Sequence, residues 1–476
     1  MPFYRSTYLR ALGASLVLFT AACADEITTT ASTPTALSRI STSPALSIES
    51  PKHLVHFTGD DIPASFSARI TALGGTVDAA YDGVGIAVVD GLTPDAATQL
   101  AADAGISAVD PDNVFQFIDD SAGTASADAT GTVLASPTNP AAAAFFPFQW
   151  NMRAIGADAA WAAGQRGSAA VKVAIIDTGI DYLHPDLAGR VDLANSASFV
   201  PSDDALVSAF FPGRHVVTDL HFHGTHVAAT MNSNAFLAAG VSSMTTLMGV
   251  KVVGAGGTGS TSALLAGIVY AVDHGANVLN LSLGVRDLLS RKEKEVKDFQ
   301  RATDRVYGYA HKKGVTVIVA AGNERQDLDT KQTFKGWCGS THVTCVSATG
   351  PTSQAGFGGP WTNIDAPASY SNFGVKEVDI AAPGGNGASV VWGPCSTSSL
   401  VIPQCQTALL AIGLQGTSQA APHASGAAAL LLAQDGSLQP GQVQAILENS
   451  ADDLGAKGKD AFYGRGRINV RKALGL

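Results

Sequence analysis

Charged side chains are scarce in this chain of 476 residues, where Asp, Glu, Lys and Arg make up 15% and apolar residues 46%. The formal net charge is −10, and the lysines and arginines form no basic stripe, which argues against nucleic acid as a partner and fits a soluble exported protein. A chain with this share of apolar residues can bury a large core. Its length exceeds one average domain, so we expect two folded units plus processing segments.

Near the N-terminus the apolar run is too short to span a bilayer as a helix, since it covers only residues 11–22. Arg5 and Arg10 precede it and small residues follow, which is typical of an export signal over residues 1–24. Two cuts fit: the sequence TAAC is similar to a bacterial lipobox, which would lipidate Cys23, and ACA fits an ordinary signal peptidase. The protein is therefore expected to be secreted, or anchored to a membrane if Cys23 carries lipid.

Cysteine is also scarce, with five in the chain, and Cys23 belongs to the signal. The other four form two pairs that are close in sequence, Cys338 with Cys345 and Cys395 with Cys405. In an oxidising compartment these pairs predict two disulfides, because proximity favours this connectivity among the three that four cysteines allow. A metal site is the weaker alternative, since neither pair has metal-type spacing with nearby histidines.

The N-terminal third predicts a tether, a small folded unit and a linker. Residues 25–50 are rich in Thr, Ser, Ala and Pro and read as a flexible tether. Residues 51–118 predict the order β-α-β-β-α-β of a ferredoxin-like α+β unit: strand 53–57, helix 62–73, a strand or hairpin 77–89, a helix to 104 that Thr93 caps before Pro94, and a last strand 107–117. Residues 119–147 are small and polar, which indicates a linker open to proteolysis.

From residue 148 to 476 the pattern alternates between apolar strands and helices. Residues 171–176, 276–281 and 315–319 are typical of buried parallel strands, and residues 262–274 and 291–313 of helices. This alternation predicts an α/β domain with a doubly wound, mostly parallel sheet flanked by helices. In such a sheet, functional groups gather at the carboxyl ends of the strands.

Three motifs in this domain carry candidate chemistry. Asp177, in IDTGID, directly follows a predicted strand, and a plain Asp turn is its alternative. His223, in HGTHVAA, precedes small residues that would let a helix start close to the sheet, and the Glu of a zincin motif is absent. Ser418, in GTSQAAPH, opens an Ala-rich helix, where the helix dipole suits a nucleophile that must carry an oxyanion, although a plain N-cap serine also fits.

Taken together in the order Asp, His, Ser, the motifs resemble those of the subtilisin-like serine proteases (subtilases, peptidase S8). The resemblance runs from about Trp150 to the C-terminus and includes LSLG at 281–284 and AAGNE at 320–324. It implies peptide-bond hydrolysis through an acyl-enzyme, on protein or peptide substrates and with no cofactor for the chemistry. The implied roles are a triad of Asp177, His223 and Ser418, an oxyanion donor in Asn323, and substrate-backbone binding by Ser282, Leu283 and Gly284.

The same resemblance gives the small N-terminal unit a role. Its position before a subtilase domain resembles that of an inhibitor I9-type pro-domain, which assists folding and blocks the active site. The chain is then expected to be a zymogen that cuts itself within the linker, with its own pro-domain as an intramolecular inhibitor.

Several positions depart from the family pattern. Phe222 stands where the family usually has glycine before the catalytic histidine, so we expect it to reshape the wall beside His223. Calcium is common in the family, and a structural ion at Asp186, Asn232 and Asn234 is left open, although their loop is short. Rival functions are a pseudoprotease or binding module on the same fold, a surface lipoprotein for adhesion, and an esterase with the same triad.

Overall fold

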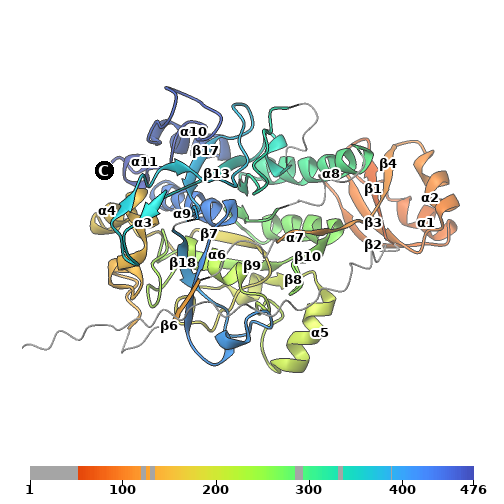
Figure 1. Cartoon of the computed structure of the whole chain (residues 1–476). Helices are drawn as coiled ribbons and strands as arrows, with labels where there is room; N and C mark the ends of the chain where they lie inside the picture. The colour runs from red at the N-terminus through yellow and green to blue at the C-terminus, as the bar shows by residue number, and fades with distance from the viewer. Residues whose placement is uncertain (1–51, 119–124, 129–133, 285–292, 331–335, 388) are drawn as a thin grey trace, which may run out of the picture.

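The computed structural model describes residues 52–118, 125–128, 134–284, 293–330, 336–387 and 389–476. The predicted export signal, including Cys23, and the predicted tether lie outside these residues. The described chain forms two units, a small one at one end of the molecule and a large one that holds the rest (Figure 1). No helix among these residues has both the length and the apolar character that crossing a bilayer requires.

The small unit is a four-stranded antiparallel sheet with two helices. Its sheet order is β2-β3-β1-β4, and its elements are β1 His53–Phe57, α1 Phe66–Ala72, β2 Thr76–Tyr81, β3 Ile86–Asp90, α2 Pro94–Ala101 and β4 Ile106–Pro111. This confirms the predicted element order. The predicted helix start is also confirmed, because Thr93 Oγ1 accepts a hydrogen bond of 3.2 Å from Ala96 N.

The predicted last strand, 107–117, is wrong in one respect: it is two strands in different sheets. β4 ends at Pro111, and β5 (Val114–Gln116) crosses to the large unit and pairs antiparallel with β10 (Thr258–Ser260). Between them the Asp112 carboxylate accepts hydrogen bonds from Ser262 N (2.9 Å) and Ser262 Oγ (2.6 Å), which turns the chain toward the large unit. Alternation of apolar residues predicts a strand but does not say which sheet it joins.

The large unit is built on one mainly parallel sheet. Its order is β16-β13-β12-β11-β7-β9-β8, with β17 also paired to β13, and every pairing is parallel except that of β13 with β16. The strands are β7 Lys172–Asp177, β8 Ala197–Ser198, β9 Thr246–Lys251, β11 Val278–Leu281, β12 Thr316–Ala320, β13 Thr344–Gly350, β16 Ala366–Pro367 and β17 Ile380–Pro383. The predicted doubly wound α/β sheet is confirmed.

Helices cover both faces of this sheet (Figure 1). Along β7, Val173 and Ile175 point into the core under α6 (His223–Met231), α9 (Thr417–Gln434) and α10 (Pro440–Ser450). Ala174 and Ile176 point the other way, into the core under α7 (Thr261–Asp273) and α8 (Glu293–Lys312). A strand covered on both faces is apolar throughout, which explains why β7 was recognisable as a run rather than an alternation.

The remaining elements lie around this centre. They are β6 Ala125–Asp128, α3 Trp150–Ala154, α4 Ala157–Ala162, α5 Pro201–Phe210, β14 Ser353–Gln354, β15 Trp361–Thr362, β18 Val391–Pro394, β19 Leu410–Leu414 and α11 Val470–Ala473, with short 3-10 turns at 140–142, 146–148, 193–195, 336–339 and 403–406. The predicted linker is therefore partly structured. β6 pairs with β19, and Phe145 is buried against Trp392, so the large unit begins before residue 148.

The small unit lies against α7 and α8, and its sheet is buried on both faces. One face packs on its own helices through Val55, Val89 and their neighbours. The other face, with Leu54, Ile86 and Val88, shares a core cluster with α7 and α8 of the large unit.

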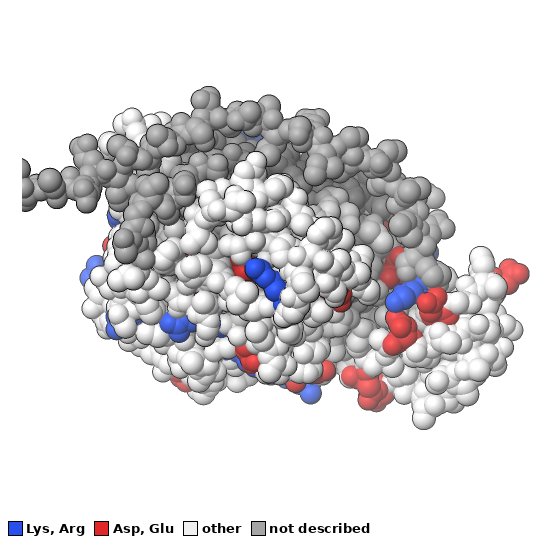
Figure 2. Space-filling model, turned by 90° about the horizontal axis from the view of Figure 1, so that it is seen from below, with Lys and Arg blue, Asp and Glu red and all other residues white. Residues whose placement is uncertain are grey.

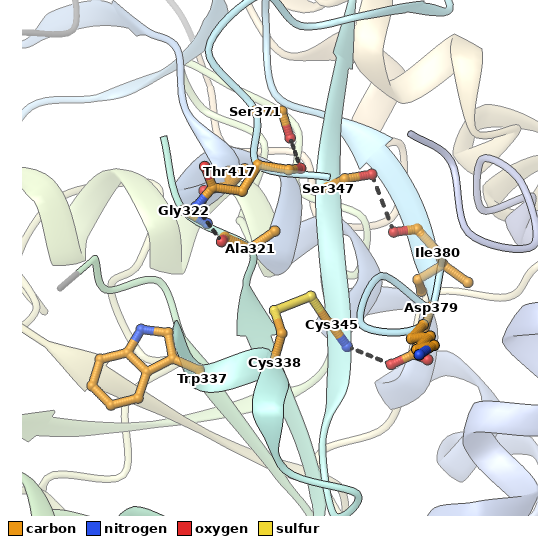
Figure 3. The surroundings of a disulfide bond; sticks show 12 residues. Ala321, Gly322, Trp337, Cys338, Cys345, Ser347, Ser371, Asp379, Ile380 and Thr417 are labelled. Carbon is orange, nitrogen blue, oxygen red and sulfur yellow. Dashed lines mark hydrogen bonds between the residues drawn. A yellow bond between two sulfur atoms is a disulfide. The ribbon is translucent and has the colours of Figure 1, made fainter. Parts of the chain in front are cut away.

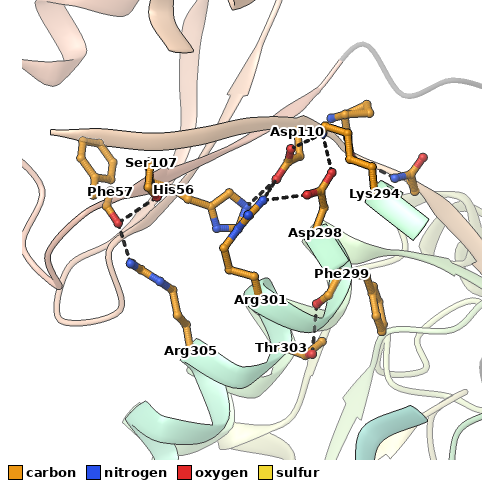
Figure 4. A network of polar contacts seen from close by, with 12 residues as sticks. His56, Phe57, Ser107, Asp110, Lys294, Asp298, Phe299, Arg301, Thr303 and Arg305 are labelled. Carbon is orange, nitrogen blue, oxygen red and sulfur yellow. Dashed lines mark hydrogen bonds and ion pairs between the residues drawn. The ribbon is translucent and has the colours of Figure 1, made fainter. Parts of the chain in front are cut away.

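Polar contacts frame this apolar interface (Figure 4). Arg305 of α8 donates hydrogen bonds to the carbonyls of Phe57 (2.6 Å) and Gly85 (2.9 Å). Asp110 accepts hydrogen bonds from Arg301 Nη2 (2.6 Å) and Lys294 Nζ (3.2 Å). Burial acts to raise the pKa of Asp110, but hydrogen bonds from His56, Arg301 and Lys294 hold that pKa well below its ordinary value.

Asp379 couples the stability of the large unit to pH. Its carboxylate accepts a hydrogen bond of 2.9 Å from Cys345 N, beside the Cys338–Cys345 disulfide (Figure 3), and Lys459 Nζ lies 3.3 Å away. Burial raises the pKa of Asp379 to about 6, from 3.8. Because the folded state holds the proton more tightly than the unfolded state, this group favours folding most below pH 3.8, and that contribution is lost as pH rises through about 6.

We expect Asp379→Asn to remove this pH dependence. In a Ser418→Ala background, which prevents self-digestion, the free energy of unfolding of the parent relative to Asp379→Asn should fall by about 2 kcal/mol between pH 4 and pH 7. Denaturant titrations at the two pH values measure it. A constant difference between the two proteins would contradict the assignment.

Candidate active site

Three neighbouring strands end at the same edge of the large sheet. Asp177 is the last residue of β7, Ser282 to Gly284 directly follow β11, and Asn323 follows β12. In the sheet order, β11 lies between β7 and β12. The structure thus brings the predicted residues to one edge, as parallel strands require.

Asp177 and His223 form a direct pair. His223 Nδ1 lies 2.8 Å from Asp177 Oδ1, and Thr178 N donates to the same oxygen at 2.8 Å. Asp177 is fully buried, and His223 is 6% exposed. Because a carboxylate oxygen only accepts, Nδ1 carries the hydrogen in this contact, which leaves Nε2 of a neutral imidazole as the proton acceptor.

The start of α6 is fixed by Asp219, a residue that the sequence reasoning missed. Its buried carboxylate accepts hydrogen bonds from Thr178 Oγ1 (2.9 Å), His221 N (3.0 Å), Thr225 N (2.9 Å) and Thr225 Oγ1 (2.6 Å). Burial raises the pKa of Asp219, and these hydrogen bonds act to lower it. Asp219 thereby ties the first turn of α6, with His223, to the end of β7. An Asp shortly before a predicted helix was the available signal.

Gly224 allows α6 to approach the strand end closely. A Cβ atom at this position would collide with the carbonyl oxygen of Gly179 and would lie 3.2 Å from Asp177 Oδ1. The prediction that small residues after His223 bring the helix against the sheet is confirmed.

Phe222, the main departure from the family pattern, is accommodated without glycine. Its φ of 164° is extended backbone, which any residue adopts. The side chain packs with the Cys395–Cys405 pair and with Ile412 and Leu414 of β19. Phe222 therefore supports the wall that the β18–β19 hairpin forms beside His223.

Ser418 lies in the first turn of α9 and pairs with Ser282. The Ser418 hydroxyl donates to the Ser282 carbonyl at 2.9 Å, and the Ser282 hydroxyl donates to the Ser418 carbonyl at 2.8 Å. These reciprocal bonds fix the helix start of α9 to the segment after β11.

Asn323 is oriented by the residue before Ser418. Its Oδ1 accepts hydrogen bonds from Thr417 N (2.8 Å) and Thr417 Oγ1 (2.9 Å). Since a backbone N–H must face the oxygen, the amide is not flipped, and Nδ2 is the donor that faces the start of α9. A Cβ at Gly416 would lie 3.6 Å from that nitrogen.

The segment after β5 lies in a groove between two backbone segments of the large unit. Gly284 N donates to Phe117 O at 2.7 Å on one side, and Phe117 N donates to Gly257 O at 2.9 Å on the other. Phe117 is buried next to Trp337, with ring centroids 6.0 Å apart. Trp337 Nε1 in turn donates to the carbonyl of Leu283 at 2.5 Å. The predicted substrate-binding residues thus contact the chain's own N-terminal unit.

The two predicted cysteine pairs lie at bonding distance. Cys338–Cys345 joins the 3-10 turn that carries Trp337 to β13 (Figure 3), and Cys395–Cys405 closes the connection between β18 and β19. The first disulfide therefore fixes the turn whose Trp337 contacts Phe117 and Leu283, and the second packs in the cluster that includes Phe222.

The calcium candidates do not fit a calcium ion. Asp186 Oδ1 accepts hydrogen bonds from Ser233 Oγ (2.8 Å), Phe236 N (2.7 Å) and Leu237 N (3.0 Å), so donors rather than oxygen ligands surround it. Arg190 Nε donates to Asn234 Oδ1 at 2.7 Å, so the positively charged guanidinium already occupies the oxygen that a calcium ion would need. Asn232 Oδ1 accepts from Ser242 Oγ and Thr245 N. Among the described residues, no group of three or more His, Cys, Asp and Glu side chains is arranged to hold a metal.

Other polar residues of the motifs have structural contacts. His226 Nε2 lies 3.1 Å from the carbonyl of Val391, and burial lowers the pKa of His226 to about 3, so its ring is neutral. Asp181 accepts hydrogen bonds from Thr397 N (2.7 Å) and Thr397 Oγ1 (2.5 Å). Both residues attach the β18–β19 hairpin to the centre of the large unit.

A parallel sheet with an Asp–His pair and a helix-opening serine at one edge defines the class of subtilisin-like hydrolases. Comparison with known proteins agrees: residues 168–466, more than half of the chain, match the model of the Subtilase family (peptidase S8). The chain therefore belongs to the subtilase family and is a serine-type endopeptidase by class.

Individual proteins with similar sequences are also serine proteinases. The chain is 31% identical to thermitase of Thermoactinomyces vulgaris over 68% of this chain and 95% of thermitase. It is 32% identical to the thermophilic serine proteinase of Bacillus sp. (strain AK1) over 65% of this chain, and it spans 63% of that relative's length.

A solved structure extends the likeness in fold. The epidermin leader peptide processing serine protease of Staphylococcus aureus matches with a TM-score of 0.65 at 24% identity, covering 89% of this chain and 98% of that one. That coverage exceeds what the large unit alone provides, so the likeness in fold includes residues of the small unit.

From the contacts of Asp186 we expect calcium to have no special effect there. In the Ser418→Ala background, Asp186→Asn should lower the free energy of unfolding by roughly 1–3 kcal/mol, because charged hydrogen bonds to buried donors are weakened. The change in Tm on adding calcium or a chelator should be the same in both proteins. A calcium effect that disappears in Asp186→Asn would show that Asp186 binds the ion.

Proposed function

We propose that this chain is an exported endopeptidase, made as a self-processing zymogen, whose catalytic triad is Asp177, His223 and Ser418. The observation that carries the proposal is the 2.8 Å contact between Asp177 Oδ1 and His223 Nδ1, which fixes the tautomer and turns Nε2 into a base. Ser418 and Asn323 lie at the same sheet edge, at the start of α9 and after β12.

The hydrogen bonds of Ser418 indicate how a substrate starts the reaction. At rest the hydroxyl donates to the Ser282 carbonyl. An extended substrate that pairs with residues 282–284 supplies a backbone N–H for that carbonyl, which frees the hydroxyl to turn toward His223. Such a step makes the nucleophile available when a peptide is bound.

The chemistry then follows the geometry. Ser418 Oγ attacks the peptide carbonyl carbon as its proton passes to His223 Nε2, while Asp177 stabilises the imidazolium. Asn323 Nδ2 and the Ser418 backbone N–H donate to the oxyanion. His223 returns the proton to the leaving amine, and water, deprotonated by the same base, hydrolyses the acyl-enzyme.

The contacts of the small unit support a zymogen. Residues 114–116 pair with β10 as a strand, and Phe117 after them is hydrogen-bonded to Gly257 and Gly284, where a substrate backbone would bind. The small unit thus excludes other peptides from the groove while it remains docked. Its buried second face and the contacts of Asp110 and Arg305 hold it there.

Export rests on the N-terminal signal, and a lipid at Cys23 would retain the protein at a membrane. Figure 2 shows charged side chains scattered over the described residues of one face, in keeping with the low charge content of the chain. Phe222, which departs from the family pattern beside His223, packs in the cluster with Cys395, Cys405, Ile412 and Leu414 and leaves the Asp177–His223 contact in place, so it favours no pseudoprotease.

We expect the chain without its signal to lose its N-terminal unit over time, and Ser418→Ala to stay intact, because self-processing requires the nucleophile. Asn323→Ala should process too, but with kcat lowered on the order of a hundred- to a thousandfold through loss of one oxyanion donor. Intact mass over time and hydrolysis of a chromogenic peptide measure both. If the parent stays full length, and an added protease releases no peptidase activity from it, the proposal is wrong.

We also expect Asp110→Asn to weaken docking of the small unit after cleavage. Loss of the charge weakens the hydrogen bonds from Arg301, which is partly exposed, and from Lys294, which is largely exposed, so the dissociation constant should rise by roughly tenfold. Recovery of activity upon dilution of the cleaved protein measures it. The matched control is Asp95→Asn, an exposed residue of α2. Equal effects of the two changes would contradict the role of Asp110.

A further inference from the structure

The outer edge of β19 carries an added strand. β6 pairs antiparallel with β19, with Gly413 opposite Ala125, Ile412 opposite Ser126 and Leu410 opposite Asp128. On its other side β19 pairs with β18, so the sheet order is β18-β19-β6. Residues 125–128 of the same chain therefore occupy the edge of β19 that faces away from β18.

The register shows which backbone groups that edge offers. Cys395 N donates to Leu410 O, so the backbone groups of Leu410 face β18. Because alternate residues of a strand face the same neighbour, the backbone groups of Ile412 and Leu414 also face β18. Ala411 and Gly413 direct theirs at β6. Pro394, which has no N–H, lies opposite Ala411, where β18 needs no donor.

The edge lies downstream of the reacting serine along the path of the chain. Residues 114–118 contact Gly257 and Gly284, beside Ser282 and hence Ser418. The next described segment, 125–128, lies on β19, which leads through Gly416 directly to Ser418. A polypeptide that binds in the same direction has its residues before the reactive bond at β10 and its residues after that bond at β19.

The hairpin is held in place before any substrate arrives. The Cys395–Cys405 disulfide closes it, and Phe222 packs beneath it. The His226 ring lies close to Gly393, where a Cβ would approach the ring to 2.7 Å. Thr397 is bound to Asp181. An edge fixed in this way accepts a strand with little loss of its own entropy.

We propose that the outer edge of β19 is a strand-addition site for the substrate: it binds the extended backbone of an unfolded polypeptide downstream of the bond that is cut. In the intact chain, residues 125–128 occupy it. Recognition by main-chain hydrogen bonds is independent of side-chain identity, so the substrates it favours are long and extended rather than short peptides. The inference rests on the proposed proteolytic function.

The test uses the activated enzyme and two peptides with the same residues up to the reactive bond. One peptide ends two residues beyond that bond, and the other continues for twelve. We expect kcat/KM to be roughly tenfold higher for the long peptide, because it alone reaches β19. If neither peptide is cut, the proposed function fails; if both are cut at equal kcat/KM, the strand-addition site is wrong.

Single N-methyl groups in the long peptide provide the matched control on the unaltered enzyme. In a strand, successive N–H groups point to opposite sides. Beyond the first few residues after the reactive bond, methylation at every second position should therefore abolish the higher kcat/KM of the long peptide. Methylation at the positions between should leave that kcat/KM unchanged. A loss that does not alternate would indicate binding without strand addition and would overturn the proposal.

Ala411→Pro tests the enzyme side. Proline removes one N–H that faces the added strand, at an edge position where proline is tolerated. Ala411→Pro should lower kcat/KM for the long peptide toward the value for the short peptide. Hydrolysis of the short peptide at the parent's rate then shows that the active site itself is intact. An undiminished preference for the long peptide would contradict the role of β19. If the variant fails to fold, the N-methyl series decides alone.

Discussion

The close contact between the start of α6 and the end of β7 is the constraint on which the site depends. Gly224 lets the helix reach the Gly179 carbonyl, and Asp219 ties the two elements together through Thr178 and Thr225. Only with the helix this close does His223 Nδ1 reach Asp177 Oδ1. A bulkier residue at 224 would push the helix away and break the contact without any change to Asp177 or His223 themselves. Buried polar groups that satisfy one another in this way specify a single arrangement.

Much of the fold could be predicted from the sequence because the strands of the large sheet are buried on both faces and appear as apolar runs. Asp177, His223 and Ser418 stood out because each follows such a strand or opens a helix, whereas Asn323 and residues 282–284 were implied by the resemblance to the subtilases. What could not be predicted are contacts between segments far apart in sequence. Phe115 and Phe117 show a strand pattern, yet nothing local indicates that β5 leaves the small sheet for β10. Asp219 was missed because the contact that ties it to the end of β7 comes from Thr178, 41 residues earlier in the chain, although its other three donors belong to His221 and Thr225 close by.

Two sequence expectations changed for physical reasons. A calcium ion at Asp186 was left open, but the amides of Phe236 and Leu237 donate to its carboxylate. Backbone donors thus compensate the buried charge where a cation would otherwise do so. The small, polar residues after 118 suggested only a linker, yet a strand such as β6 needs no apolar face when another sheet edge provides its partners.

The small unit's sheet has consequences beyond its position. One face is covered by its own helices, and the other by α7 and α8 of the large unit. While one chain joins the units, their effective concentration is high, and the shared core stays closed. If the chain is cut as proposed, the two units become separate molecules whose association depends on concentration, and a small unit that leaves would carry an uncovered apolar face with Leu54, Ile86 and Val88 into water. Its lifetime as a separate molecule is then limited by its own exposed surface, which makes release self-reinforcing: a unit that unfolds or is digested after leaving cannot rebind.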